Sequence, residues 1–284
     1  MTNALLTMDS QESKKISVSS DLNNTNITWG GAGSVIAVST KEGVFLPFGL
    51  RNETAPVFKT QLGTASGNID DSDSQLYPEH TAIRESSEEI LMYDRTEESW
   101  VVPKTRNPET DSISKEAITK TVQELRTKMN YSTTEEFHTI PSQRFELSDK
   151  ETKIESGEES RILEGLIISE PRLKTTDYLD LLVVDYSHRS IAELTFFDGE
   201  LLESPTPERQ REIYLFTLDQ FKSMLNQPVT VERIFRYGEL YATKHKTETT
   251  RDFSEGYQFT EILPLYYLVG KSHSKVCEVL DQNL

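Results

Sequence analysis

Short apolar runs separated by turn signals recur along the first quarter of the chain. Residues 34–39 have the apolar pattern of a central strand, Lys41, Glu42 and Gly43 form a turn signal, and residues 44–46 follow as the hairpin partner. Residues 57–70 are typical of a further strand that ends in a glycine-containing loop. The pattern therefore predicts several strands ahead of the first helix.

A helix is expected over residues 78–93. Pro78 suits the first helical turn, where a missing N–H is no loss, and Glu79 complements the helix dipole. Four apolar residues would form its buried side: Ala82, Ile83, Ile90 and Leu91. A second face carries three carboxylates, which the i, i+3, i+4 spacing brings within about 6 Å of one another: Glu85, Glu88 and Glu89. We expect this carboxylate face to point away from the core.

The three glutamates carry like charges, which repel one another at such spacing. A helix gains from this cluster only if a positive group lies on it. Arg84 is one such group. A divalent metal is another, because hard cations prefer oxygen ligands. The cluster is therefore the first candidate for chemistry in this chain.

The remaining two thirds alternate between polar segments and regular elements. A helix is expected over residues 114–129, and residues 212–221 have the pattern of a short strand that runs into a helix. Further apolar or alternating runs predict strands over residues 162–168, 178–186 and 192–197, sheet or a mixed extension over 229–237, 240–243 and 259–269, and a closing helix over 275–280. This mixture predicts an α/β chain of the α+β type.

Charge and cysteine content exclude several classes of protein. The 284 residues include 47 acidic and 30 basic residues, a formal net charge of −17. Such a surface repels phosphate backbones, so nucleic acid is not expected to bind through a broad basic face. The single Cys277 excludes an intrachain disulfide and a cysteine-based zinc site. The sequence shows no signal peptide and no spanning helix, which predicts a cytoplasmic protein without a membrane partner.

The order of strand, hairpin strand, glycine loop and helix resembles the Nudix hydrolase family. The family signature is Gly-x5-Glu-x7-Arg-Glu-U-x-Glu-Glu-x-Gly-U, where U is bulky and aliphatic. Five positions fall on it: Arg84, Glu85, Glu88, Glu89 and Met92. Four depart from it: Leu76 replaces a Glu, Ser86 replaces an aliphatic residue, Leu91 replaces a Gly, and Gly67 lies three residues upstream of the leading glycine.

The resemblance implies a Nudix-like fold, a mixed β-sheet sandwiched between helices. Residues 1–28 would be a flexible lead-in and residues 29–284 a single domain, with an insertion at 94–160 and a C-terminal extension at 228–284. The implied activity is hydrolysis of a phosphoanhydride bond in a nucleoside diphosphate linked to another moiety. A homodimer is compatible with the sequence.

The resemblance also implies roles for particular residues, with Mg²⁺ or Mn²⁺ as the cofactor. Glu88 and Glu89 would be the chief metal ligands, Glu85 a ligand or the catalytic base, and Arg84 the residue that fixes the carboxylates. The backbone carbonyl of Gly67 would add a ligand. The fourth acidic ligand would come from a later loop, whose candidates are Glu200, Glu203, Glu208 and Glu212, with Glu203 favoured.

Two other classes of function stay open at this point. One is a Nudix-like binding or regulatory domain without turnover, which the departures at Leu76, Ser86 and Leu91 allow. The other is an interaction protein in which the carboxylates are a solvated face.

Overall fold

The computed structural model describes residues 28–51, 59–69, 78–103, 108–131, 154–156, 161–170, 173–199, 212–236, 257–258, 262 and 264–284. Its helices are α1 (Pro78–Glu89), α2 (Pro108–Tyr131), α3 (Leu218–Ser223) and α5 (Tyr267–Asn283), with a 3-10 turn, η2 (Ile191–Glu193). None of the helices in these ranges is long and apolar enough to cross a membrane.

Eight strands form the larger sheet in the part of the chain that the structure describes. Its main path runs β13 (Arg233–Arg236), β11 (Glu212–Thr217), β2 (Gly43–Leu50), β1 (Gly31–Thr40), β9 (Thr175–Asp185) and β8 (Arg161–Glu170). Two short strands lie off this path: β3 (Leu62–Gly63) pairs with β2, and β4 (Ala65–Asn68) pairs with β1. Strands β1 and β9 are parallel, whereas the other pairs of this sheet are antiparallel, so the sheet is mixed.

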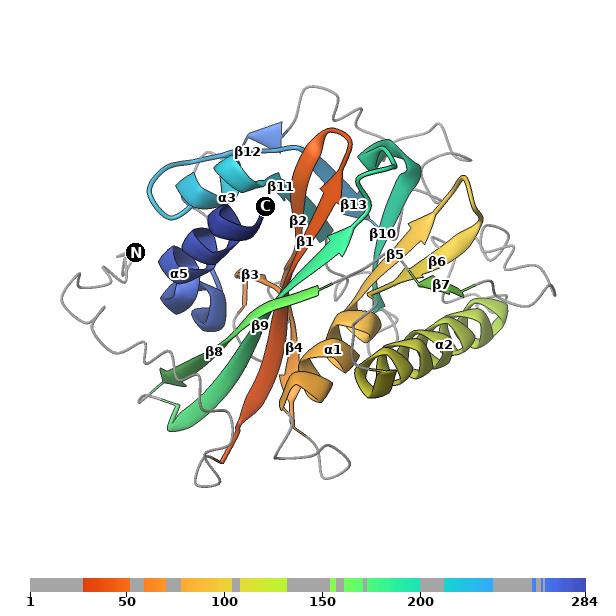
Figure 1. The fold of residues 1–284 in the computed structure, drawn as a ribbon, viewed down its shortest axis with the longest axis horizontal. Coiled ribbons are helices and arrows are strands. Elements are labelled where there is room, and N and C mark those ends of the chain that lie inside the picture. The colour runs from red at the N-terminus through yellow and green to blue at the C-terminus, as the bar shows by residue number, and fades with distance from the viewer. Residues whose placement is uncertain are drawn as a thin grey trace.

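The second sheet has four strands in the order β10 (Leu194–Asp198), β5 (Ile90–Asp94), β6 (Ser99–Val102) and β7 (Ile154–Ser156). A small separate pair consists of β12 (Thr230–Val231) and β14 (Tyr257–Gln258). Strand β5 follows α1 without a connecting residue. The last turn of α1 is therefore attached directly to the second sheet (Figure 1).

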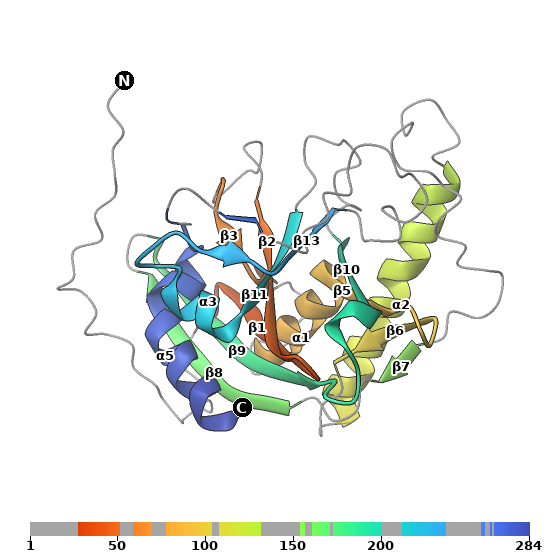
Figure 2. The same cartoon turned by 90° about the horizontal axis from the view of Figure 1, so that it is seen from above.

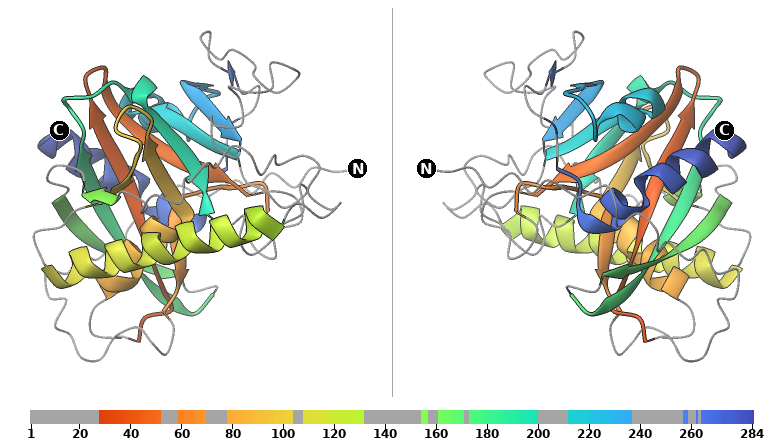
Figure 3. Two further views of the ribbon diagram at one scale, coloured as in Figure 1. Left: turned by 90° about the vertical axis from the view of Figure 1, so that its right-hand side faces the viewer. Right: turned by 90° about the vertical axis from the view of Figure 1, so that its left-hand side faces the viewer.

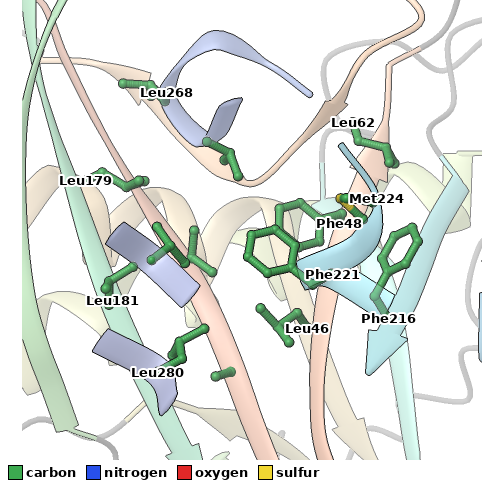
Figure 4. Packing of buried hydrophobic residues seen from close by; sticks show 14 of the residues in the cluster. Leu46, Phe48, Leu62, Leu179, Leu181, Phe216, Phe221, Met224, Leu268 and Leu280 are labelled. Carbon is green, nitrogen blue, oxygen red and sulfur yellow. The ribbon is translucent and has the colours of Figure 1, made fainter. Parts of the chain in front are cut away.

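The helices and sheets form layers (Figures 1 and 2). One face of the larger sheet packs against α3 and α5, where Phe48 of β2 stacks on Phe221 of α3 at 5.4 Å between ring centroids (Figure 4). Its other face packs against α1 and the second sheet. The outer face of the second sheet packs Trp100 against Ile118 and Val122 of α2, and Figure 3 shows α2 on this side. Helix α1 thus lies inside the molecule.

Most predicted elements are present, and the α+β fold with a mixed sheet and helices is confirmed. The hairpin at residues 41–43 and the passage from strand to helix at Thr217 are both found, and the helix predicted at 114–129 extends over 108–131. The division into a lead-in and one domain stays a prediction, and residues 1–27 and 240–243 lie outside the described ranges.

Two predicted boundaries are wrong. The helix predicted over 78–93 ends at Glu89, because the residues after it alternate between two buried faces, with Ile90 and Met92 toward the larger sheet and Leu91 toward α2. Apolar residues on both sides suit a central strand as well as a helix. The closing helix begins at Tyr267 and not at 275, so the end of the 259–269 run is helical.

Strand β9 carries a buried acid in the middle of an otherwise apolar run. Asp180 is fully buried and accepts a hydrogen bond of 2.6 Å from the Tyr178 hydroxyl. Burial raises the pKa of Asp180 to about 8, against the opposing effect of that hydrogen bond. The folded protein therefore retains a proton on Asp180 that the unfolded chain releases near the ordinary pKa of 3.8.

Asp180→Asn is expected to make the stability of the protein less dependent on pH. In the wild type the raised pKa of Asp180 stabilises the fold below 3.8, and this contribution is lost as the pH rises toward about 8. One retained proton corresponds to a decline of about 1.4 kcal/mol per pH unit in the free energy of unfolding. Urea unfolding between about pH 5 and about pH 8 measures this decline. Equal slopes in the two proteins would show that Asp180 is ionised in the fold.

Candidate functional site

Arg84 ties two of the predicted carboxylates together on α1. Its Nη1 lies 2.8 Å from Glu85 Oε1 and 2.7 Å from Glu88 Oε2. The three side chains are only partly exposed, at 22%, 12% and 26% for Arg84, Glu85 and Glu88. The arginine therefore pairs with two of the three carboxylates, and its predicted role in fixing them for catalysis stays a prediction.

Glu89 faces the edge of the larger sheet. It is buried, with 7% of its surface exposed, and its Oε2 accepts a hydrogen bond of 2.9 Å from the backbone N–H of Ser66 in β4. An N–H donor favours the charged form of a carboxylate and holds its position. The last turn of α1 and the edge strand β4 are thus joined at this glutamate.

Gly67 lies against the carboxylate of Glu85. A Cβ atom on Gly67 would stand 2.2 Å from Glu85 Oε1 and 2.5 Å from Oε2. Only glycine leaves room for a carboxylate this close to the strand. The sequence predicted a loop at Gly67, but the residue lies in β4, where it pairs with Ala32 of β1.

The predicted orientation of the carboxylate face is wrong. Glu85 and Glu89 are buried at 9% and 7% exposure, because both face β4, where Gly67 lies against Glu85 and the Ser66 N–H donates to Glu89. Burial is the largest cause that raises the pKa of Glu85, to about 8, and the neighbouring charge of Glu89 raises it further. Two negative charges in a buried place are stable only when a cation or a proton compensates them.

The donor set of this pair fits a small divalent cation. Mg²⁺ is typically bound by one or two carboxylates and completes its shell with water and phosphate oxygens. Glu85 and Glu89 supply two such groups beside the backbone of Gly67. Within the described ranges, no three acidic, histidine or cysteine side chains are close enough together to hold a metal ion between them. Glu85 and Glu89 are thus the two candidate metal ligands, and Glu88 forms an ion pair with Arg84 beside them.

Small polar residues let α1 pack closely on both sides. The hydroxyls of Ser86 and Ser87 are buried and donate to the carbonyls of Ala82 and Ile83, one turn earlier. The Ser87 hydroxyl also lies 2.7 Å from the hydroxyl of Ser114 on α2. Ser86, which replaces the aliphatic residue of the signature, thus satisfies its own polar group within the helix.

The structure places two residues at the site that the sequence had not indicated. Gly199 packs so closely on α1 that a Cβ atom there would stand 1.6 Å from the carbonyl oxygen of Glu88. Asp198, buried at 4% exposure, pairs with Ile90 directly after Glu89. The signal in the sequence that could have indicated them is the Asp198-Gly199 pair directly after the strand predicted over residues 192–197. Of the four proposed loop acids, Glu200, Glu203 and Glu208 lie outside the described residues, and Glu212 begins β11.

Comparison with solved structures finds Nudix hydrolases among the similar chains. No family model matches the sequence, and no curated protein matches it. A Nudix hydrolase from M. smegmatis, RenU, matches 64% of this chain and 80% of its own at 11% identity and a TM-score of 0.24. A NUDIX hydrolase from Alicyclobacillus acidocaldarius matches 64% of this chain and 86% of its own at 13% identity and a TM-score of 0.27. Similarity this low assigns no family, so the function is argued from the site.

Proposed function

We propose that the protein is a metal-dependent hydrolase of a phosphoanhydride bond in a nucleoside diphosphate linked to another moiety. The observation that carries the proposal is the buried pair Glu85 and Glu89, which lies against the backbone of β4, with Glu85 also paired to Arg84. Buried like charges cost stability, and a cation-binding role accounts for them. In the alternative of an interaction protein, the carboxylates would form a solvated face and would be exposed.

The residues divide into those that hold a cation and those that hold the carboxylates. Glu85 and Glu89 would bind Mg²⁺ or Mn²⁺, and Glu88, which pairs with Arg84, lies on the more exposed side of them. When bound, the metal would neutralise phosphate charge and activate water. Arg84 keeps Glu85 and Glu88 in place, and Ser66 keeps Glu89 in place. Glu85 would be either a ligand of the cation or the base that accepts the proton of the attacking water.

Incubation with Mg²⁺ and a panel of substrates tests the proposal. The panel contains ADP-ribose, dinucleotides, nucleoside triphosphates and, as a control without a phosphoanhydride bond, AMP. We expect nucleoside monophosphate to form from at least one linked diphosphate, and no product with EDTA. Absence of product with every substrate, together with metal-dependent nucleotide binding, would instead support the regulatory domain without turnover.

A further inference from the structure

Helix α2 is docked on α1 at the turn that carries the glutamates. Ser114 contacts Ser87, and the buried face of α2 continues through Ala117, Ile118 and Thr121. Gly199 lies between Thr121 and Glu88. A Cβ atom on Gly199 would stand 3.4 Å from the methyl group of Thr121 and would collide with the carbonyl oxygen of Glu88. Thr121 is therefore next to the backbone of Glu88, separated from it by a single glycine.

Lys120 precedes Thr121 and is exposed at the border of this contact. Among the described residues, its positive charge and that of Arg84 act on Glu88. Within the same ranges, no hydrogen bond or ion pair holds the Lys120 ammonium. A lysine side chain has a long flexible stem, so this ammonium can reach a ligand beside Glu88.

Arg84 is less suited to bind a ligand. Its Nη1 already contacts Glu85 and Glu88, and moving it to a phosphate would leave the crowded carboxylates without their counter-charge. Glu88, with 26% of its side chain exposed, is also the most exposed of the three glutamates. The side of the carboxylate cluster that is nearest to solvent is therefore that of Glu88.

We propose that Lys120 is a substrate-binding residue that contacts a phosphate group of the substrate at the exposed, Glu88 side of the site. This inference rests on the proposed function and adds a residue from α2, outside the helix that carries the carboxylates. In a chain of net charge −17, a phosphate needs a local positive group in addition to any metal. A lysine ammonium supplies that charge as a flexible point donor.

Lys120→Met tests the inference in steady-state kinetics and in binding. Loss of a charged contact to phosphate is expected to raise KM about 10-fold and to leave kcat within about 2-fold of the wild-type value. The reason is that Lys120 would contact the phosphate equally in the bound ground state and in the transition state. Lys120→Arg should retain most of the affinity. Calorimetric titration with inorganic pyrophosphate and Mg²⁺ should show the same weakening of about 10-fold in Lys120→Met.

Lys115→Met is the matched control, because it removes the same charge from the same helix. Lys115 is exposed and forms an ion pair of 2.8 Å with Asp111, away from the carboxylates. Its KM and its pyrophosphate affinity should equal those of the wild type. Equal pyrophosphate binding by Lys120→Met and wild type, or no binding by the wild type, would overturn the role of Lys120. Lys120-dependent binding without hydrolysis of any substrate would instead retain Lys120 and reject the proposed activity.

Discussion

Glu89→Gln is expected to lower metal-dependent turnover about 1,000-fold, the equivalent of several kcal/mol of transition-state stabilisation. The amide keeps an oxygen that can accept the hydrogen bond from the Ser66 N–H but loses the negative charge that would bind the cation. Michaelis kinetics at saturating Mg²⁺, and Mn²⁺ binding followed by electron paramagnetic resonance, measure the two losses separately.

The same substitution should not destabilise the fold. The charge of Glu89 helps to raise the pKa of Glu85, so its removal relieves a repulsion between buried groups. We expect a melting temperature equal to or above that of the metal-free wild type. Glu116→Gln, at an exposed position on α2, is the control for loss of one negative charge. Full turnover in Glu89→Gln would show that the buried pair has no part in catalysis.

Gly67→Ala is expected to reduce turnover about 100-fold while the protein stays folded. The added methyl group would occupy the place of the Glu85 carboxylate, which is the movable end of a flexible side chain. The carboxylate can turn aside at little cost in stability, within about 1 kcal/mol, but displacement of a catalytic group by about 1 Å is enough for a loss of this size. Kinetics and thermal unfolding of the same preparation measure both effects.

Gly63→Ala is the matched control for this substitution. Gly63 lies in the neighbouring short strand β3, and a Cβ there would find only ordinary contacts, the nearest at 3.9 Å. Its turnover and stability should match those of the wild type. A Gly67→Ala protein that keeps full turnover would show that Glu85 is not needed in its present position. Gly199→Ala is unsuitable for this comparison, since its methyl group would meet backbone atoms that cannot move aside.

The sequence predicted the elements of the site better than their surroundings. The sequence indicated Arg84 as a positive group for the carboxylates, and Arg84 forms an i, i+4 ion pair with Glu88. The hairpin at residues 41–43 could be predicted because turn residues act locally. Burial of Glu85 could not be predicted, because it depends on how β4 pairs with β1 and so comes to lie against α1.

Residues whose role depends only on where the fold places them could not be predicted either. Ser66 contributes a backbone N–H, so its side chain gives no signal in the sequence. Lys120 lies on a helix that was predicted correctly, but only the docking of α2 on α1 places it beside Glu88. The end of α1 was misplaced because an apolar run such as Ile90 to Met92 suits a helix and a buried strand equally.

The site takes its parts from separate layers of the molecule. The carboxylates belong to α1, which continues directly into the second sheet, whereas the N–H of Ser66 and the glycine at 67 belong to the larger sheet. The hydrogen bonds within each layer do not set the distance between the layers, which depends on contacts such as those from Ser66 to Glu89 and from Ser34 to Ala82. Catalytic output would consequently respond to a sliding of one layer past the other that leaves the secondary-structure content intact, and loss of activity would precede melting.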